Sequence, residues 1–218
     1  MSEPSSDTPA AMESRTWSER RLHSPSAGRN KAAIAHELAR ILPADAAVLE
    51  IGSGTGEHAV AACQAREDII WHPSDPDAQS RASQDAWSTE CPGRIQASRA
   101  LDVSLADWPA GLPETDAIVC CNVIHISPWR VAEGLAKGAE NLLSPGAPLV
   151  LYGPFLEGEK TAPSNLEFDA SLKSRNPEWG VRARDDVETL LARHGFDLEQ
   201  VIGMPANNLM LVFRKTAR

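Results

Sequence analysis

The stretch VLEIGSGTGEHA, residues 48–59, decides the fold that this sequence predicts. Its apolar first half reads as a short strand, and three glycines, Gly52, Gly54 and Gly56, lead from it into a helical segment. Glycines at such a junction let the backbone turn tightly and approach a ligand closely, and the start of the helix offers free N–H groups. We therefore expect a ligand-binding turn of a doubly wound α/β domain; a tight turn without a ligand is the alternative.

Apolar runs of strand length alternate with helical patterns along most of the chain. We predict strands over residues 46–52, 68–75, 94–104, 116–126 and 147–155. We predict helices over residues 26–42, 57–67, 76–90, 128–146 and 184–195. Residues 196–215 predict two further strands joined by a Pro-Ala-Asn-Asn turn. This alternation indicates an α/β fold with a mostly parallel sheet, helices on both faces and an antiparallel C-terminal edge strand.

Two segments fall outside this alternation. Residues 1–20 are rich in Ser, Pro, Glu and Thr, and we expect them to be a disordered tail before a single domain over residues 21–218. Residues 156–184 are too long for an ordinary connection and follow a central strand, which places them at the carboxyl edge of the sheet. Because ligands bind at that edge in open α/β folds, we expect this insertion to form a lid over a substrate.

Composition narrows the class of partner. The 218-residue chain carries 30 acidic and 21 basic residues, a net charge of −9, whereas proteins that bind nucleic acid usually present a basic patch. The four cysteines form no CxxC pair, which predicts reduced thiols in a cytoplasmic protein. No apolar stretch approaches the ~20 residues that span a bilayer. We expect a small-molecule partner, with no nucleic acid and no membrane.

Three classes of ligand compete for the glycine turn. A phosphate loop requires GxxxxGK[ST], and no lysine follows here; a dinucleotide loop has the spacing GxGxxG, and Gly56 comes one place too early for it. The third class is S-adenosylmethionine, whose sulfonium and ammonium groups are positive. Glu50 at the end of the strand suits a cationic cofactor and would repel a pyrophosphate.

Polar residues follow the later strands of the predicted sheet. Asp75 ends the second strand and is placed to accept both hydroxyls of a ribose, although it also suits the cap of the helix that begins near Pro76. Asp102 ends the third strand, and a simple turn residue is the alternative interpretation of it. Asn122 and His125 follow the buried fourth strand, where a structural role for the histidine is the alternative.

The helices add candidates that are equally open. His58, just inside the helix after the glycine turn, faces either the pocket or solvent. Arg29 either binds a carboxylate of cofactor or substrate or lies on the helix surface. No spacing among the histidines and cysteines matches a known metal-ligand set, so we expect no metal.

These stretches together resemble the class I methyltransferases. Within that class they resemble a small family long described as a domain of unknown function, whose animal members are called methyltransferase-like twenty-six. The matching stretches run from about His23 to Lys215 and are HSPSAGRNKAAI, VLEIGSGTGEHA, WHPSD, CCNVIHISPW, LYGPF, SNLEFDASLKSRNPEWGVR and MPANNLMLVFRK. The glycine loop alone is generic, whereas the other motifs are more specific. The family often has alanine where this chain has Gly52, and either small residue should let the loop turn.

The resemblance implies a Rossmann-like class I methyltransferase fold with a seven-stranded sheet. It also implies the cofactor S-adenosylmethionine, with S-adenosylhomocysteine as its product. An acid at the position of Asp102 commonly faces the adenine amino group in this class. With the residue-based arguments, the predicted cofactor contacts are Arg29, Asn30, Glu50, Gly52, Ser53, Gly54, Thr55, Gly56, His58, Asp75, Asp102 and Asn122.

We predict methyl transfer to an oxygen, nitrogen or sulfur atom of a small molecule. His125 and Tyr152, the only tyrosine, are the candidates for a base or a neighbour of the methyl group, and Tyr152 is otherwise a core residue. The predicted substrate contacts are Asn165, Arg175, Trp179 and Asn207, the last of which also suits a simple hairpin turn. The alternatives are a nicotinamide-dependent oxidoreductase and a regulatory protein that binds S-adenosylmethionine without turnover.

Overall fold

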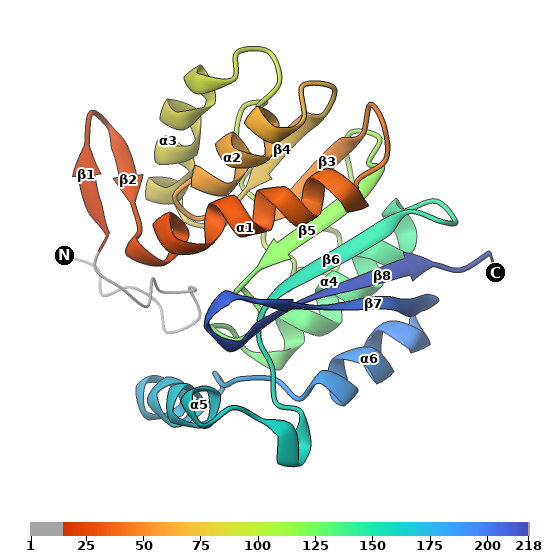
Figure 1. The fold of residues 1–218 in the computed structure, drawn as a ribbon. Coiled ribbons are helices and arrows are strands. Elements are labelled where there is room, and N and C mark those ends of the chain that lie inside the picture. Colours follow the sequence, from red (N-terminus) through yellow and green to blue (C-terminus); the bar gives the residue numbers. More distant parts are fainter. Residues whose placement is uncertain (1–14, 218) are drawn as a thin grey trace.

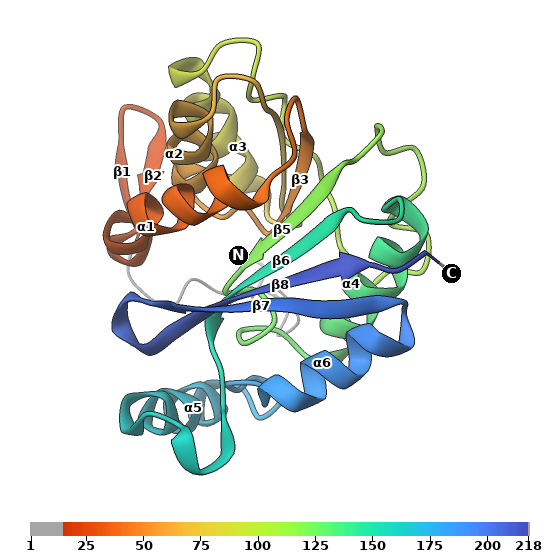
Figure 2. The same ribbon diagram turned by 45° about the vertical axis from the view of Figure 1, so that its right-hand side comes forward.

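The computed structural model describes residues 15–217, which form a central sheet between two layers of helices (Figures 1 and 2). Within these residues the sheet has six strands in the order β4-β3-β5-β6-β8-β7. The strands are β3 (Ala47–Ile51), β4 (Ile70–Ser74), β5 (Ala117–Cys121), β6 (Pro148–Pro154), β7 (Phe196–Met204) and β8 (Asn208–Lys215). β3, β4, β5 and β6 pair in parallel, and β8 is antiparallel to both of its neighbours.

Two groups of helices cover the two faces of the sheet (Figure 1). On one face lie α1 (Pro25–Ile41), α2 (Glu57–Ala65) and α3 (Ala78–Trp87). On the other lie α4 (Trp129–Leu142) and α6 (Arg184–Arg193). A further helix, α5 (Pro163–Arg175), lies beyond the carboxyl ends of the parallel strands. Short 3-10 turns are η1 (Ser88–Glu90), η2 (Gly158–Lys160) and η3 (Pro205–Asn207).

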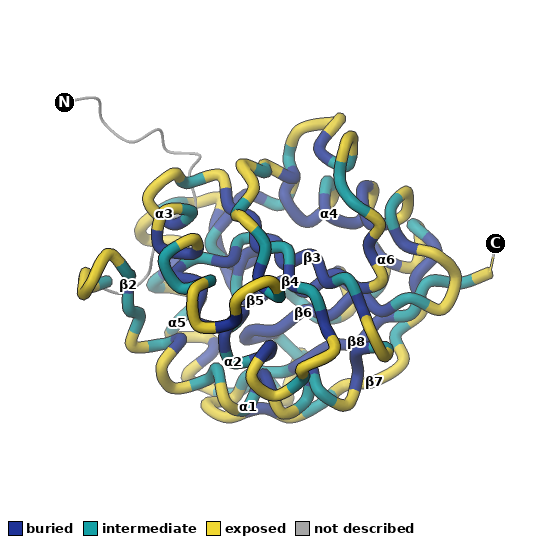
Figure 3. The backbone as a smooth tube through the Cα atoms, turned by 90° about the horizontal axis from the view of Figure 1, so that it is seen from above, coloured by how far each residue is buried: buried dark blue, intermediate teal, exposed yellow. Residues whose placement is uncertain are grey.

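Alternation along the central strands divides the core into two layers. All five residues of β5 are buried: Val119 and Cys121 pack with α1 and α2, whereas Ile118 and Cys120 pack with α4 and α6. A strand covered on both faces must be apolar at every position, which explains the unbroken run seen in the sequence. Seen from above, the buried strands lie inside a shell of exposed helix and loop surface (Figure 3). The predicted mostly parallel α/β architecture is therefore confirmed.

The sheet differs from the expected seven strands at residues 94–104. This segment runs along the outer edge of β4 but forms only two isolated bridges, Trp71 with Ile95 and Ser74 with Arg99. Pro73 lies between the two bridges and has no N–H to donate, so a continuous ladder cannot form there. The segment occupies the place of the seventh strand without becoming one.

The C-terminal strand is antiparallel as expected, but it lies inside the sheet and not at its edge. β8 sits between β6 and β7, with Leu211 paired to Leu151 on one side and Val201 on the other. Its centre, MLVF, is fully buried, whereas β7 alternates exposed charged residues with apolar ones. The more polar strand of the hairpin therefore takes the solvent-exposed edge.

The N-terminal tail is ordered over part of its predicted length. Strands β1 (Thr16–Ser18) and β2 (Arg21–His23) form a hairpin that docks on α3, where the backbone N–H of Leu22 donates to Ser83 Oγ at 2.7 Å. Residues 15–20 are thus structured, in contrast to the expectation, and the rest of the predicted tail lies outside the described residues. Among helices α1 to α6, none is both long and apolar enough to cross a membrane.

Gly134 in α4 gives a direct test of the packing. A Cβ at this position would lie 1.9 Å from the backbone oxygen of Val103, whereas a Cβ at Gly28 in α1 would meet nothing within 4 Å. We expect Gly134→Ala to lower the free energy of unfolding by roughly 2 kcal/mol or more through overpacking. The matched Gly28→Ala should raise it by about 0.5–1 kcal/mol, because alanine favours helix. Urea unfolding of both variants measures the difference, and equal effects would contradict the packing.

Candidate functional site

A large cavity opens at the carboxyl ends of β3, β5 and β6. Its volume is about 1000 Å3, and its walls come from α1, the glycine loop, the loops after β4 and β5, and α5. Fourteen of the sequence-predicted residues line it: Arg29, Asn30, Gly52, Ser53, Gly54, Thr55, His58, Asp75, Asp102, Asn122, His125, Tyr152, Asn165 and Arg175. The remaining four, Glu50, Gly56, Trp179 and Asn207, do not line the cavity.

The glycine loop presents bare backbone to the cavity. Gly52, Gly54 and Gly56 all have positive φ angles, of 66°, 56° and 94°. Gly56 is the N-cap of α2, and a Cβ there would lie 3.0 Å from Gln84 Cα of α3, so this glycine serves packing and not the cavity. The loop is fixed from outside by Gln84 Nε2, which donates to Gly54 O at 3.0 Å.

Gly52 is more restricted than the family resemblance implied. A Cβ at this position would lie 2.4 Å from Cγ2 of Val123 in the loop after β5. Alanine is therefore not equivalent to glycine in this chain, contrary to the expectation that either small residue would serve. The contact brings the glycine loop and the β5 loop together at the floor of the cavity.

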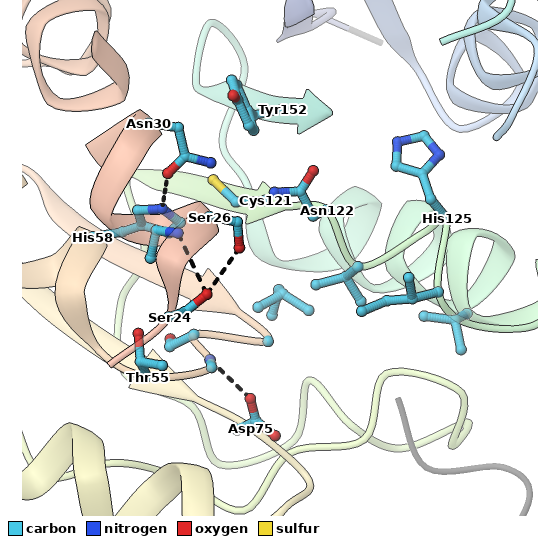
Figure 4. A pocket seen from close by; sticks show the side chains of 18 of the residues that line it. Ser24, Ser26, Asn30, Thr55, His58, Asp75, Cys121, Asn122, His125 and Tyr152 are labelled. Carbon is cyan, nitrogen blue, oxygen red and sulfur yellow. Dashed lines mark hydrogen bonds between the residues drawn. The ribbon is translucent and has the colours of Figure 1, made fainter. Parts of the chain in front are cut away.

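Asp75 joins the glycine loop to the loop after β4. Its Oδ2 accepts from the Gly54 N–H and its Oδ1 from the Asp77 N–H, both at 2.9 Å. Burial raises the pKa of Asp75 to about 6, although these N–H groups and the nearby Arg15 act in the opposite direction. The helix cap proposed for Asp75 is instead Asp77, whose side chain accepts from Ser80 N at 2.7 Å. Asp75 therefore has no capping role and faces the cavity (Figure 4).

Asp102 and Asn122 also line the cavity. Asp102 comes from the turn after the segment that contains Ile95, and Asn122 comes from the loop after β5. Asp102 is exposed and its Oδ1 accepts from Ser104 N and Oγ, so it also has the turn role that was the alternative. Asn122 has a φ angle of 61°, and its N–H donates to Tyr152 O at 2.8 Å. Asparagine tolerates this left-handed conformation better than most residues, which explains the residue type at this sharp exit from β5.

Glu50 lies beneath the cavity and not in its wall. Its side chain is 1% exposed; Oε2 accepts from Trp71 Nε1 at 2.9 Å, while Oε1 is 3.7 Å from His58 Nδ1. Oε1 has no hydrogen-bond partner among the described residues. One ligand atom each of Glu50, His58 and Cys121 lie within 4.8 Å of one another, but burial raises the pKa of the Cys121 thiol well above its usual range. A protonated thiol is a poor metal ligand.

A chain of polar side chains leads from Glu50 through His58 and Asn30 to Tyr152. His58 Nε2 lies 2.9 Å from Asn30 Oδ1, and the Asn30 side chain also hydrogen-bonds to the Tyr152 side chain. These three side chains come from α2, α1 and β6 and lie together at one end of the pocket (Figure 4). His58 therefore faces the pocket and not solvent.

Glu57 holds α1 over the glycine loop, a role that the sequence analysis missed. Its carboxylate accepts from Ser24 N and Lys31 Nζ, both at 3.0 Å, and from Thr55 Oγ1 at 3.1 Å. Burial acts to raise the pKa of Glu57, but these hydrogen bonds and the Lys31 charge outweigh it and lower the pKa. An acid in the first turn of the helix after a glycine loop is the signal that could have indicated this role.

His125 is buried and held in one tautomer. Its Nδ1 accepts from the Arg182 N–H at 3.3 Å, so the neutral ring carries its proton on Nε2, which has no partner among the described residues. Burial, followed by the Arg182 charge, lowers the pKa of His125 to about 3. A neutral imidazole of this tautomer donates a hydrogen bond from Nε2 and does not accept a proton. This geometry contradicts the base role considered for His125.

The expected lid contains a helix that the sequence did not predict. One face of α5 lines the cavity and carries Ser164, Asn165, Phe168, Ser171 and Arg175, at helical spacing. The helix is only weakly amphipathic because the face toward the cavity mixes apolar and polar residues, which explains why periodicity did not reveal it.

Two of the predicted substrate contacts have structural roles instead. Trp179 is buried with Leu172 and Val181 in a small apolar cluster behind α5. Asn207 docks the η3 turn onto α5: its O accepts from Asn165 Nδ2 and its Nδ2 donates to Ser164 Oγ, both at 3.0 Å. Both residues fix α5 in place and do not line the cavity.

Two arginines of the cavity wall, Arg15 and Arg130, were not predicted from the sequence. Arg15 donates to Ser80 Oγ at 3.0 Å, beside the glycine loop, and gave no signal because it lies in the stretch assigned to the tail. Arg130 opens α4 and follows the motif HISPW, whose position after a central strand could have indicated it.

The sheet order, the glycine loop and the acid after β4 define the class I methyltransferase fold, and solved structures agree. The pyocyanin biosynthetic protein PhzM matches with a TM-score of 0.70 and 19% identity over 89% of this chain and 60% of its own. The SAH-bound methyltransferase CalO1 of calicheamicin biosynthesis matches with a TM-score of 0.70 and 17% identity over 85% of this chain and 54% of its own.

An O-methyltransferase family protein from Burkholderia thailandensis matches with a TM-score of 0.73 and 13% identity, over 85% of this chain and 55% of its own. The chain thus spans little more than half the length of these structures, and at such identities the likeness establishes the fold alone. Residues 21–215 match the family described as "Protein of unknown function (DUF938)", and the chain belongs to that family.

The contact between Gly52 and Val123 predicts a specific double-mutant result. Gly52→Ala should lower the melting temperature, because the new Cβ meets Val123 Cγ2 and alanine disfavours the positive φ. Adding Val123→Ala removes the obstructing methyl groups and should recover part of the loss, giving a coupling energy of about 1 kcal/mol or more. Strictly additive effects of the two substitutions would show that contact with Val123 does not constrain the loop.

Proposed function

We propose that the protein is an S-adenosylmethionine-dependent methyltransferase that acts on an oxygen, nitrogen or sulfur atom of a small molecule. The observation that carries the proposal is Asp75: a buried acid bound to the glycine loop that faces a cavity of about 1000 Å3. The resemblance of the chain's other motifs to the methyltransferase-like twenty-six family supports the same proposal. Four buried, unpaired cysteines support a cytoplasmic setting, and the acidic net charge argues against a nucleic-acid partner.

The residues of the cavity fit this cofactor. The glycine loop lines the cavity with Arg15 beside Gly54, and Asp75 is placed to accept the ribose hydroxyls. Asp102 would stand at the adenine, and Asn30 and His58 at the amino-acid end, above the unpartnered Glu50 Oε1. A carboxylate beneath this end attracts a cationic group through Coulomb interaction, even though it makes no wall contact. S-adenosylmethionine, when bound, supplies a methyl group on a sulfonium.

The chain's own residues align the acceptor and exclude water. Helices α1 and α5 both contribute to the cavity wall and restrict access to it. The two helices lie apart from each other, on either side of the carboxyl ends of the parallel strands (Figures 1 and 2). Holding two reactants in line in this way accounts for a large part of the rate in displacement reactions. His125 also lines the cavity, but its Nε2 is buried close to Gly153, so we assign this side chain a role in shaping the wall.

Tyr152 is likewise unsuited to accept a proton. Burial raises the pKa of its phenol, while the hydrogen bond from Asn30 acts in the opposite direction, so the group stays protonated at neutral pH. With His125 neutral and Tyr152 a phenol, neither is a base. We infer that the acceptor presents a nucleophilic atom whose lone pair is already available.

Ligand-induced stabilisation separates this function from the alternatives. S-adenosylhomocysteine should raise the melting temperature by several degrees, and NAD(H) should not, because only a ligand of the native state stabilises it. The opposite pattern would indicate a nicotinamide oxidoreductase. Stabilisation by S-adenosylhomocysteine without labelled product from any metabolite fraction and methyl-labelled cofactor would indicate a regulatory protein.

Asp75 predicts how cofactor binding depends on pH. The ionised carboxylate is the stronger acceptor for ribose hydroxyls, and its pKa of about 6 means that it gains a proton as the pH falls through that value. Affinity for S-adenosylhomocysteine should therefore be constant above about pH 7 and fall several-fold by about pH 5. Asp75→Ala should weaken binding at neutral pH by ~1–3 kcal/mol.

Calorimetric titration across this range measures both effects. Asp75→Asn retains the side-chain shape but does not titrate, so its weaker binding should lose the pH step seen in the wild-type protein. A wild-type affinity that stays flat from about pH 5 to 8, or a variant that keeps the step, would remove Asp75 from the cofactor site.

A further inference from the structure

The charges that line the cavity run against the charge of the whole chain. The protein has a net charge of −9, yet its cavity is lined by four arginines and two aspartates, with no glutamate or lysine among the described lining residues. These are Arg15, Arg29, Arg130 and Arg175, and Asp75 and Asp102. Among the described lining residues, basic side chains therefore outnumber acidic ones, the reverse of the chain as a whole.

The two aspartates lie on the cofactor side of the cavity. Asp75 is bonded to the glycine loop, and Asp102 is in the turn that follows the strand-like segment beside β4. Arg15 is on that side as well, where its charge acts on Asp75. Among the described lining residues, the acceptor side therefore contains arginines and no acid.

Two separate helices supply the arginines of the acceptor side. Arg130 comes from the first turn of α4 and Arg175 from the last turn of α5, whereas Arg29 of α1 is next to Asn30, at the proposed amino-acid end of the cofactor. Arg130 also forms a 3.4 Å ion pair with Glu178, but both side chains are about half exposed, and such pairs are weak. Because a guanidinium carries five N–H donors, an existing contact leaves it able to bind a further anion.

Part of the cavity wall is apolar on the side of α5. Ile126 after β5 and Phe168 of α5 line the cavity there and also pack against one apolar cluster. The wall thus combines an apolar surface with the hydrogen-bond donors and positive charge of the arginines.

We propose that the methyl acceptor is an anionic small molecule, whose carboxylate or phosphate binds Arg130 and Arg175 at the cavity mouth and whose apolar body lies against Ile126 and Phe168. Planar guanidinium groups bind both anions through paired N–H donors. This inference rests on the proposed methyltransferase function and specifies its substrate class. The proposal also agrees with the inference that neither His125 nor Tyr152 acts as a base, because an acidic acceptor can present a deprotonated nucleophile.

Separating metabolites by charge tests the proposal. A metabolite extract of the source cells is divided by anion exchange near neutral pH into a retained and an unretained fraction, and each is incubated with the protein and methyl-labelled S-adenosylmethionine. Labelled product should arise from the retained fraction. Product from the unretained fraction alone would overturn the anionic acceptor and leave the methyltransferase function intact, whereas no product from either fraction would count against the function itself.

Two further arms sharpen this result. The retained fraction should also raise the melting temperature of protein saturated with S-adenosylhomocysteine, a readout that needs no turnover. Treating that fraction with alkaline phosphatase distinguishes the two anions: loss of product indicates a phosphate, and unchanged product indicates a carboxylate.

Arg175→Gln tests the cavity mouth, with Arg193→Gln as its matched control. Both arginines are exposed and lie in the last turn of a helix, α5 and α6 respectively, so both substitutions remove the same helix-dipole interaction. For the purified acceptor, Arg175→Gln should raise KM about tenfold while the Kd of S-adenosylhomocysteine stays within about twofold. Arg193→Gln should change neither. Equal KM values for the two variants would show that Arg175 does not bind the acceptor.

Discussion

A buried carboxylate connects the two loops on which the cofactor side of the cavity depends. Asp75 accepts the Gly54 N–H with one oxygen and the Asp77 N–H with the other, and so fixes the glycine loop relative to the start of α3. Burial disfavours its ionised form and raises its pKa to about 6, while the two N–H groups favour the charge. The group is therefore ionised near neutral pH at some cost to the stability of the folded protein, as is common where a site is built for binding.

From this point the cavity divides into two chemically different sides. The cofactor side has bare glycine backbone, two aspartates and, beneath it, the buried Glu50. The other side has an apolar wall and arginines from α4 and α5. A cationic methyl donor and an anionic acceptor would each meet the opposite charge, and their mutual attraction would favour the approach that methyl transfer requires.

The fold could be predicted from the sequence because its local patterns agree with the tertiary structure. The unbroken apolar run of β5 could only be a strand covered on both faces, and the glycine loop could only join such a strand to a helix. Asp75 was recognisable because its place at the end of a strand is set by sequence alone. Most residues of the cavity wall could be predicted in the same way. The carboxyl ends of parallel strands lie at one edge of the sheet, so the residues that follow these strands come together there.

The errors arose where a distant contact decides the outcome. The tautomer of His125 depends on the N–H of Arg182, which is 57 residues away, and the restriction at Gly52 depends on Val123 of another loop. Pro73 prevented the seventh strand by acting on a neighbouring segment and not on its own. Trp179 resembled a binding residue in an irregular stretch, but its neighbours Leu172 and Val181 complete an apolar cluster that no local pattern announced.

A crystal structure of the protein grown with S-adenosylhomocysteine tests the central claim most directly. The account predicts continuous ligand density along the glycine loop, with the ribose hydroxyls within hydrogen-bond distance of the Asp75 carboxylate and the thioether facing the side of the cavity lined by His125 and Arg175. Ligand density elsewhere, or an Asp75 carboxylate that does not contact the ribose, would contradict it.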